Sequence, residues 1–206
     1  MSRLARCIAS VIIGGLVGCS SSVHIVGIKV TGPILLLDLF PQAHKTTEPP
    51  AKLQERVRVT EIRIESKPER VLFLHPKSVV TFSLRIERSA ILDTAIALAP
   101  EVWDNKEADG VTFYVQVRRE GEGFPTYLFS RHLYPQLLEE HRGWQPVRID
   151  LTPFRNTDIE LILATDPGPK GNPLYDWAVW RDPRIYNPIT DEAWATTISG
   201  AKPDEY

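Results

Sequence analysis

The chain has 206 residues, of which 43% are hydrophobic and 24% are charged, and its formal net charge at pH 7 is −2. This length fits one globular domain plus a targeting segment. Because a nucleic-acid-binding protein presents a basic face to the phosphates, the nearly balanced charge excludes nucleic acid as the expected partner.

The N-terminus has the parts of a secretory signal peptide. Arg3 and Arg6 precede an apolar run over residues 7–18, which is too short to cross a bilayer because about 20 apolar residues are needed. The run leads into Leu-Val-Gly-Cys, which resembles the bacterial lipobox and implies cleavage before Cys19 and attachment of lipid to its thiol. The alternative is an ordinary secretory signal in which Cys19 is coincidental.

Lipidation at Cys19 predicts where the mature protein lies. Cleavage removes Cys7 and leaves Cys19 blocked by lipid, so we expect no disulfide. Ser20 occupies the position where, by resemblance to Gram-negative sorting rules, an aspartate would retain the protein at the inner membrane. We therefore expect a lipid anchor in the cell outer membrane, with the protein facing the periplasm or the cell surface.

A second apolar stretch follows the lipidation site. Lys29, Pro33 and Asp38 interrupt it, and a charge at bilayer depth costs several kcal/mol, so we do not expect a transmembrane helix. We interpret residues 1–18 as the signal peptide and residues 19–52 as the lipidated N-terminus and tether. Consecutive prolines within residues 46–52 cannot continue a helix or a central strand, which places the start of the folded domain at Leu53.

Residues 53–186 have the pattern of a β-sandwich domain. Apolar and polar residues alternate with period two over residues 79–87 and 111–118, as in strands with one buried face. Turn-forming Gly, Pro and Asp residues separate further predicted strands, at residues 57–65, 70–74, 91–98, 127–131, 147–151, 159–164 and 175–180. Short strands without alternating helices predict an all-β, antiparallel sandwich or barrel.

The first predicted strand has a change of phase. Val57 and Val59 are in phase with each other but not with Ile62 and Ile64. An extra residue in the strand would restore the phase, so we expect a bulge near residues 60–61.

The segments between and after the strands carry weaker signals. Residues 134–143 are expected to form a helical turn or a long loop between two strands. Residues 187–206 are expected to form a C-terminal tail with a short helix over residues 191–197, capped by Thr190 or Asp191.

Motifs of catalysis are missing from the sequence. It contains no G-x-S-x-G, H-E-x-x-H, G-x-x-x-x-G-K-[ST] or C-x-x-C pattern, and its five histidines are dispersed. Glu139 and Glu140 are adjacent, so on a helix they point about 100° apart and cannot flank a substrate. We therefore expect that the protein is not an enzyme.

One acidic segment is a candidate metal site. Asn105, Glu107, Asp109 and Gly110 occupy the first, third, fifth and glycine positions of a calcium loop. The twelfth position is Gln116 and a strand follows, which excludes an EF-hand. A turn at Asp109 and Gly110 that leads into the strand is favoured over a metal site of any kind, and the metal remains unknown.

The aromatic residues near the C-terminus could stack on a ligand or fill the core. If residues 175–180 are extended, Tyr175, Trp177 and Val179 share one face and Trp180 lies on the other. The two tryptophans then cannot form one platform, so we expect one ring to be buried and the other to lie at the surface.

Two segments, DGVTFYVQVRREG and DIELILATDPGPKGNPLYDWAVWRDPRI, resemble the galactose-binding-like jelly rolls and especially the NPCBM family, the novel putative carbohydrate-binding module. That family has a late strand of the type D-H-A-D-W-A-x-A-x-L. Asp176, Ala178, Trp180 and Ile185 occupy its aspartate, alanine, tryptophan and leucine positions. The resemblance implies a two-sheet jelly roll that binds a ligand at its loops or on a concave face, with no cofactor other than the structural calcium found in related folds.

The resemblance also supplies candidate ligand contacts. Sugars are commonly held by a ring face together with hydrogen-bonding acids and a guanidinium group. The candidate residues are Trp103, Asp104, Tyr175, Asp176, Trp177 and Arg181.

These observations lead to one expected function and one alternative. The first is a lipid-anchored, noncatalytic cell-envelope protein that binds a glycan or polysaccharide. The alternative is a protein-interaction or scaffold lipoprotein of an envelope or polysaccharide-export assembly. An exposed aromatic side chain beside an acid would favour the glycan, and a broad apolar patch would favour the protein partner.

Overall fold

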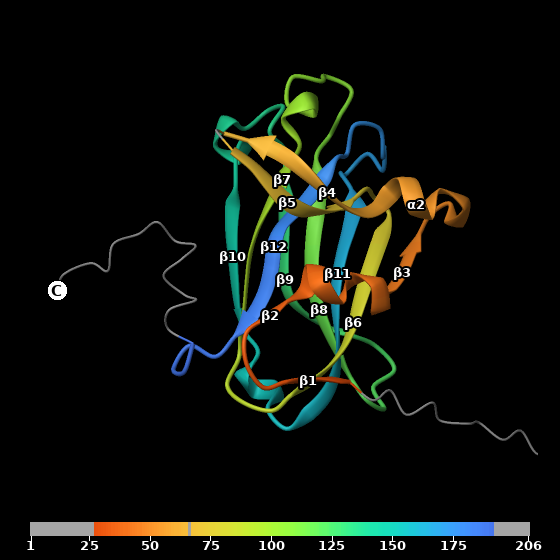
Figure 1. Ribbon diagram of the computed structural model, residues 1–206. Helices are drawn as coiled ribbons and strands as arrows, with labels where there is room; N and C mark the ends of the chain where they lie inside the picture. The colour runs from red at the N-terminus through yellow and green to blue at the C-terminus, as the bar shows by residue number, and fades with distance from the viewer. Residues whose placement is uncertain (1–26, 66, 192–206) are drawn as a thin grey trace, which may run out of the picture.

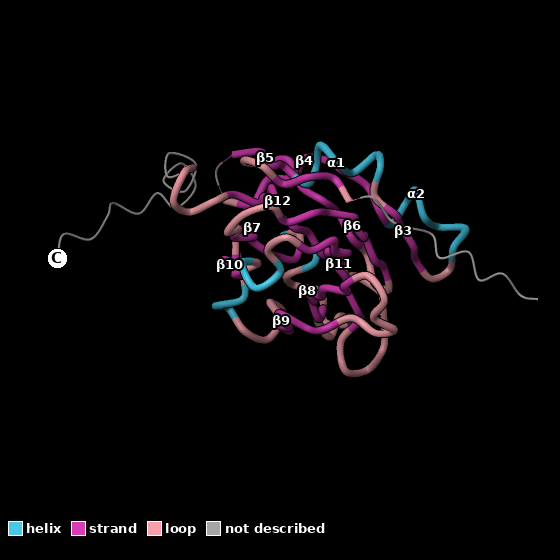
Figure 2. The backbone as a smooth tube through the Cα atoms, turned by 90° about the horizontal axis from the view of Figure 1, so that it is seen from below, coloured by secondary structure: helices cyan, strands magenta, loops and turns pink. Residues whose placement is uncertain are grey.

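The computed structural model describes residues 27–65 and 67–191, which form two six-stranded β-sheets packed face to face (Figures 1 and 2). In spatial order, the first sheet contains β1 (Ile28–Val30), β6 (Ser78–Ile86), β11 (Thr157–Pro167), β8 (Val111–Arg119) and β9 (Thr126–Leu133), with β3 (His44–Thr47) also beside β6. The second contains β10 (Gln145–Asp150), β7 (Ile91–Leu98), β12 (Ala178–Tyr186), β5 (Lys67–Leu74) and β4 (Val57–Ile64), with β2 (Ile34–Leu35) also beside β12.

Neighbouring strands run antiparallel, except that β1 runs parallel to β6. The prediction of an all-β, antiparallel two-sheet sandwich is therefore confirmed. The helices are single turns in the connections: α1 (Leu36–Leu39), α2 (Leu53–Arg56), η1 (Phe40–Gln42), η2 (Pro50–Lys52), η3 (Pro100–Val102), η4 (Glu139–His141) and η5 (Thr152–Phe154). In the described part of the chain, none of them is long and apolar enough to cross a bilayer.

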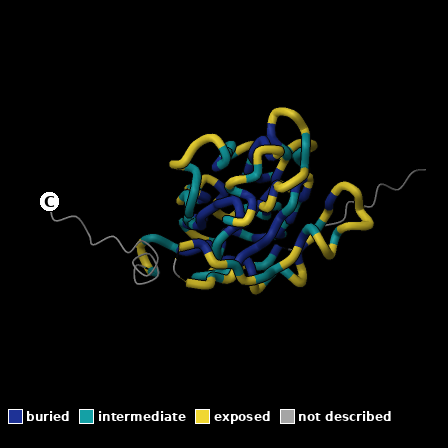
Figure 3. The backbone as a smooth tube through the Cα atoms, turned by 90° about the horizontal axis from the view of Figure 1, so that it is seen from above, coloured by how far each residue is buried: buried dark blue, intermediate teal, exposed yellow. Residues whose placement is uncertain are grey.

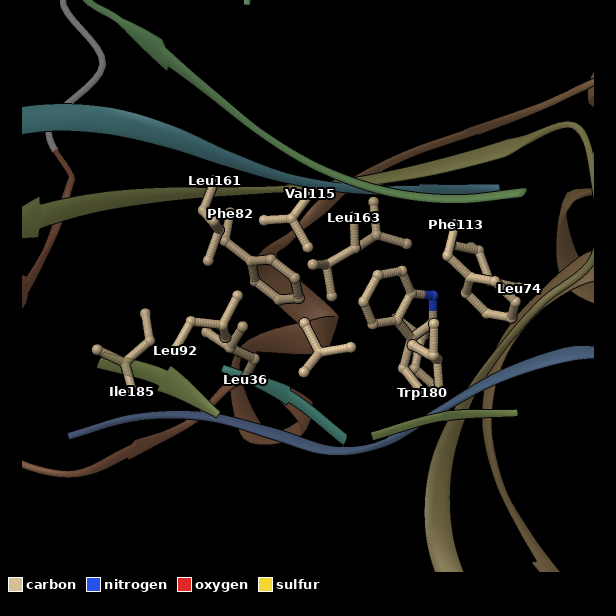
Figure 4. Close-up of a cluster of buried hydrophobic side chains, with 14 of the residues drawn as sticks. Leu36, Leu74, Phe82, Leu92, Phe113, Val115, Leu161, Leu163, Trp180 and Ile185 are labelled. Carbon is tan, nitrogen blue, oxygen red and sulfur yellow. The ribbon is translucent and has the colours of Figure 1, made fainter. Parts of the chain in front are cut away.

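The core lies between the inner faces of the two sheets. Phe82, Phe113 and Leu161 project from the first sheet towards Trp180 and Ile185 of β12 (Figure 4). Trp180 is completely buried, and its ring meets that of Phe113 edge to face at 5.4 Å between centroids. Since a buried aromatic ring removes a large apolar area from water, this pair contributes strongly to the packing of one sheet on the other.

A second, smaller apolar cluster explains the phase change in β4. Val57 faces the main core, whereas Ile64 packs on the outer face of the second sheet with Val71 and Phe73. A regular strand points residues of opposite parity to opposite faces, so each set packs against its own apolar cluster without an extra residue. The prediction of a bulge at residues 60–61 was wrong, because β4 pairs with β5 in one continuous register.

The N-terminal boundary of the domain also needs correction. From β1 onward, the segment expected to be a tether is part of the sandwich: β1 and β3 pair with β6, and β2 pairs with β12. Leu36 and Leu37 of α1 are buried in the core. The folded domain therefore starts before Leu53, and these short pieces protect the edge of β6 and part of the edge of β12.

The remaining predicted strands are present, with ends that differ by a few residues, and residues 134–143 form turns between β9 and β10 as expected. The last strand is the exception, because β12 begins at Ala178 and not at Tyr175. The signal peptide, Cys19 and the predicted helix over residues 191–197 lie outside the described residues, apart from Asp191. The side chain of Asp191 accepts a hydrogen bond from the backbone N–H of Asn187 at 2.8 Å.

Candidate functional site

Three loops meet at one end of the sandwich, which we call the loop end. They are residues 99–110 between β7 and β8, residues 134–144 between β9 and β10, and residues 168–177 between β11 and β12 (Figure 1). Figure 3 looks onto this end and shows exposed loops above the buried strands. The side-chain amide of Gln136 donates to the Val102 carbonyl at 2.9 Å, and that of Asn172 donates to the Glu107 carbonyl at 3.2 Å, so the loops are tied together.

Trp177 is the exposed tryptophan that the sequence predicted, and Trp180 is the buried one. Trp177 remains 38% exposed, as does Tyr175. The residues are not extended as expected, because Tyr175 has a left-handed backbone (φ 65°) and the strand begins three residues later. The carbonyl of Trp177 accepts the Ala99 N–H at 2.9 Å, which fixes the backbone beneath the exposed ring.

Trp103 and Asp104 lie on the neighbouring loop beside Arg142. Trp103 is half-buried: its ring packs against the apolar residues of both clusters, and its indole N–H donates to the Leu98 carbonyl at 2.8 Å. Asp104 is exposed and its carboxylate accepts a hydrogen bond from Arg142 at 2.8 Å, while the Arg142 guanidinium lies 6.0 Å from the centre of the Trp103 ring. Trp103 therefore serves packing, and the Asp104–Arg142 pair supplies charged hydrogen-bonding groups at the surface.

Asp176 needs a correction, because it cannot contact a surface ligand. Its side chain is fully buried, and neither carboxyl oxygen has a hydrogen-bond partner. Burial, together with the nearby charge of Asp109, raises the pKa of Asp176 from 3.8 to about 8. Desolvation disfavours the ionised form, and a second carboxylate disfavours it further, so Asp176 is a neutral acid at pH 7.

Asp109 is the second member of this buried acid pair. It is 2% exposed; its Oδ2 accepts the Lys170 N–H at 2.6 Å, and its Oδ1 has no partner. Gly168 packs so closely that a Cβ there would lie 2.4 Å from the Asp109 carbonyl oxygen. Asp109 therefore fastens loop 168–177 to loop 99–110 through its bond with Lys170, and burial keeps both acids away from any substrate in solvent.

The acid pair can be compared with the calcium that the sequence resemblance implies. Asp109 and Asp176 offer three unpaired carboxyl oxygens, a ligand type that Ca²⁺ prefers. Ca²⁺ takes about six to eight oxygens, and among the described residues no three His, Cys, Asp or Glu side chains are grouped as a metal site. These side chains do not supply a complete calcium site. A proton on Asp176 removes the repulsion between the Asp109 and Asp176 carboxylates without a metal.

Gly110 has the backbone angle that was expected at the entry to the strand. Its φ is +85°, a conformation that glycine adopts without strain, and β8 begins at the next residue.

Arg181 is separated from the other predicted contacts. It lies on the outer face of the second sheet, where its guanidinium stacks 4.9 Å from the centre of the Trp144 ring and lies 3.4 Å from the Glu69 carboxylate. It lines a hollow of about 620 Å³ that also contains Arg70 and Asp182. The bulge in β12 between Arg181 and Arg184 lies here, with Asp182 at φ 39°.

The sequence analysis missed Arg142 and Trp144. Both lie in the loop before β10, where a single Arg-Gly-Trp segment has no periodic pattern, so their roles depend on contacts with residues far away in the chain. It also missed the exposed Leu137 and Leu174, which are 72% and 57% exposed at the loop end.

No protein-family model matches the chain. One similar curated protein is an uncharacterised protein of Archaeoglobus fulgidus, 38% identical over 130 residues, which are 60% of this chain and 32% of that protein. The chain thus spans about a third of the length of that relative.

Two solved structures of the CBM51-2 and INT domains of Clostridium perfringens ZmpB align with 75% of this chain and 31% of theirs, at 19% identity. The one in complex with GlcNAc has a TM-score of 0.50 and the other a TM-score of 0.51. The chain has a galactose-binding-like jelly-roll fold. The resemblance noted in the sequence is thereby confirmed for the fold.

Proposed function

We propose that this protein is a noncatalytic glycan-binding module held at the outer membrane by lipid on Cys19. The observation that carries the proposal is the exposed ring of Trp177, which shares the loop end of a jelly roll with the ion pair of Asp104 and Arg142. The ring offers a face on which a sugar can stack, and the charged pair offers groups at the same end that can bond to the hydroxyl groups of a glycan. The fold shared with carbohydrate-binding modules supports this assignment.

The course of the chain supports the proposed anchoring. The described chain begins beside β1, at the end of the sandwich opposite the loop end (Figure 1). Seven residues separate Cys19 from Gly27, so the chain makes eight steps between them and can span at most about 27 Å, at about 3.4 Å per step. A lipid on Cys19 would therefore hold the β1 end towards the membrane and leave the loop end directed away from it.

Glycan arrays and polysaccharide pulldowns with the full chain in mild detergent test the proposal. We expect binding to at least one glycan, weakened by about tenfold, or about 1.4 kcal/mol, in Trp177→Ala. The matched control is Phe124→Ala, which removes another exposed aromatic ring, 87% exposed, from the turn between β8 and β9. Failure of the wild-type chain to bind any glycan, with and without calcium, would refute the proposal.

A protein partner is the second candidate, and the apolar side chains of the loop end favour it. Leu137, Leu174, Tyr175 and Trp177 are all exposed there. Apolar side chains that gather at one end of a molecule are typical of interaction surfaces. Photo-crosslinking from position 174 in the envelope, compared with position 124 as a control, would identify a specific partner if this candidate is correct and yield no defined product if it is not.

A further inference from the structure

A groove lies on the outer face of the first sheet, on the strands rather than on the loops. Its volume is about 370 Å³, within the range of about 300–1,000 Å³ that is typical of ligand sites. Its floor is apolar and comes from Val79, Ile162 and Ala164, of which the last two are only 8% exposed. The walls come from β3, β8 and β9, so the groove is built on strands and is more rigid than the loops.

Two tyrosines form one wall of this groove. The rings of Tyr114 and Tyr127 meet edge to face at 5.5 Å between centroids, and Tyr127 stays 62% exposed. The contact with Tyr114 restricts the Tyr127 ring before any ligand arrives. A ring that is both fixed and exposed offers a flat apolar face with a hydroxyl at its edge, which suits stacking against a pyranose.

Polar groups with free hydrogen-bonding capacity line the same groove. The Gln116 amide and the Asp166 carboxylate have no hydrogen-bond partner in the described part of the chain. Amide and carboxylate groups that do not already bond to protein can bind the hydroxyl groups of a sugar.

The charges of the groove indicate which kind of polymer it accepts. Lys77 lies 3.7 Å from the Glu48 carboxylate, so its positive charge is already paired, and Asp166 leaves the lining with an excess negative charge. An anionic polymer would meet repulsion here, because no unpaired cation lines the groove. A neutral chain rich in hydroxyl groups would not.

The N-terminal segment completes this groove. Thr46, Thr47 and Glu48 belong to or follow β3, which pairs with β6 along its edge. Without β3 the groove would lose one wall. The N-terminal segment therefore forms part of the groove as well as part of the sheet.

We propose that this groove is a second glycan-binding site, which takes a neutral polysaccharide through Tyr127, Gln116 and Asp166. The inference rests on the proposed function, but it concerns a different face of the molecule. Two separate sites on one small module would raise its avidity for a long polymer, because the second binding event takes place within one complex.

The test isolates the groove by working in a Trp177→Ala background. Native gels that contain β-glucan, galactan, mannan or dextran, and parallel gels with alginate or polygalacturonate, report retardation of the full chain in mild detergent. We expect a neutral polysaccharide to retard Trp177→Ala, and the added change Tyr127→Ala to raise the dissociation constant by at least about tenfold. Tyr127→Phe keeps the ring and should retain most of the binding, and Phe124→Ala should change nothing.

The outcomes separate the two proposals. If wild type is retarded but Trp177→Ala is not, the proposal of a binding site in the groove is wrong and the proposal of a loop-end site stands. The groove proposal would also be overturned if a folded Trp177→Ala protein that carries Tyr127→Ala is still retarded, or if only the acidic polymers cause retardation. If no polysaccharide retards wild type, both proposals fail.

Discussion

Asp176→Asn offers a direct test of the buried acid pair. The variant keeps the shape of the side chain, removes its charge at every pH, and gives the buried site N–H donors beside Asp109, whose Oδ1 has no partner. We expect its stability relative to wild type to rise steadily from pH 5 to pH 8.

The size of this effect follows from the pKa of Asp176. Folding raises that pKa from 3.8 to about 8, so between these values the folded chain holds a proton that the unfolded chain has lost. This contribution is fully present below pH 3.8 and is lost as pH rises through 8. Each pH unit changes the free energy of unfolding by about 1.4 kcal/mol, so wild type should lose on the order of 4 kcal/mol relative to Asp176→Asn between pH 5 and pH 8.

Urea denaturation followed by tryptophan fluorescence measures both proteins at several pH values, with EDTA in every buffer. Taking the difference in the free energy of unfolding between variant and wild type cancels the contributions of titrating groups that the substitution does not affect. His75 and His141 are such groups, because burial lowers the pKa of each. Asp104→Asn is the matched control, because Asp104 is exposed at the loop end and its replacement should leave the pH dependence unchanged.

A difference that stays constant from pH 5 to pH 8 would refute the argument. A constant difference in which the variant is the less stable protein would point to an ionised Asp176 that is compensated by another charge. Repeating the series with CaCl₂ identifies that charge: calcium that stabilises wild type at pH 8 but not Asp176→Asn would place the ion at the acid pair.

Four further predictions concern packing and targeting. Trp180→Ala should lower the free energy of unfolding by about 3–5 kcal/mol, because the fully buried ring leaves a cavity between the sheets. Gly168→Ala should lower the urea midpoint, because the new Cβ would collide with the Asp109 carbonyl. In a Gram-negative host, Cys19→Ser should abolish labelling by an alkyne fatty acid, and Ser20→Asp should shift the labelled protein from the outer-membrane to the inner-membrane fraction of a density gradient.

Each of these predictions has a contrary result. A midpoint for Gly168→Ala equal to that of wild type would mean that loop 168–177 can move away from Asp109. Fatty-acid labelling that persists in Cys19→Ser would place the lipid elsewhere, and an unchanged fraction for Ser20→Asp would mean that this residue does not direct sorting. A loss below about 1 kcal/mol in Trp180→Ala would contradict its place in the core.

The sequence alone predicted features that depend on local pattern. Period-two alternation located β6 and β8, because a strand buried on one face repeats its contacts at every second residue. The left-handed backbone of Gly110 at the entry to β8 followed from residue type, since that conformation favours glycine. The division of Trp177 and Trp180 into an exposed and a buried ring was also predicted, although the stretch before Ala178 is not extended.

Only the tertiary structure decided the features that depend on residues far away in the chain. Residues of β1, β2 and β3 carry weak local signals and fold because the edges of β6 and β12 are open to them. Asp176 is buried near Asp109 of loop 99–110, and Arg181 faces Trp144 on the outer face of the second sheet. Alternation along a strand tells which residues share a face. What packs against that face is set by segments that are distant in sequence. Those long-range contacts determined which of the predicted residues lie together.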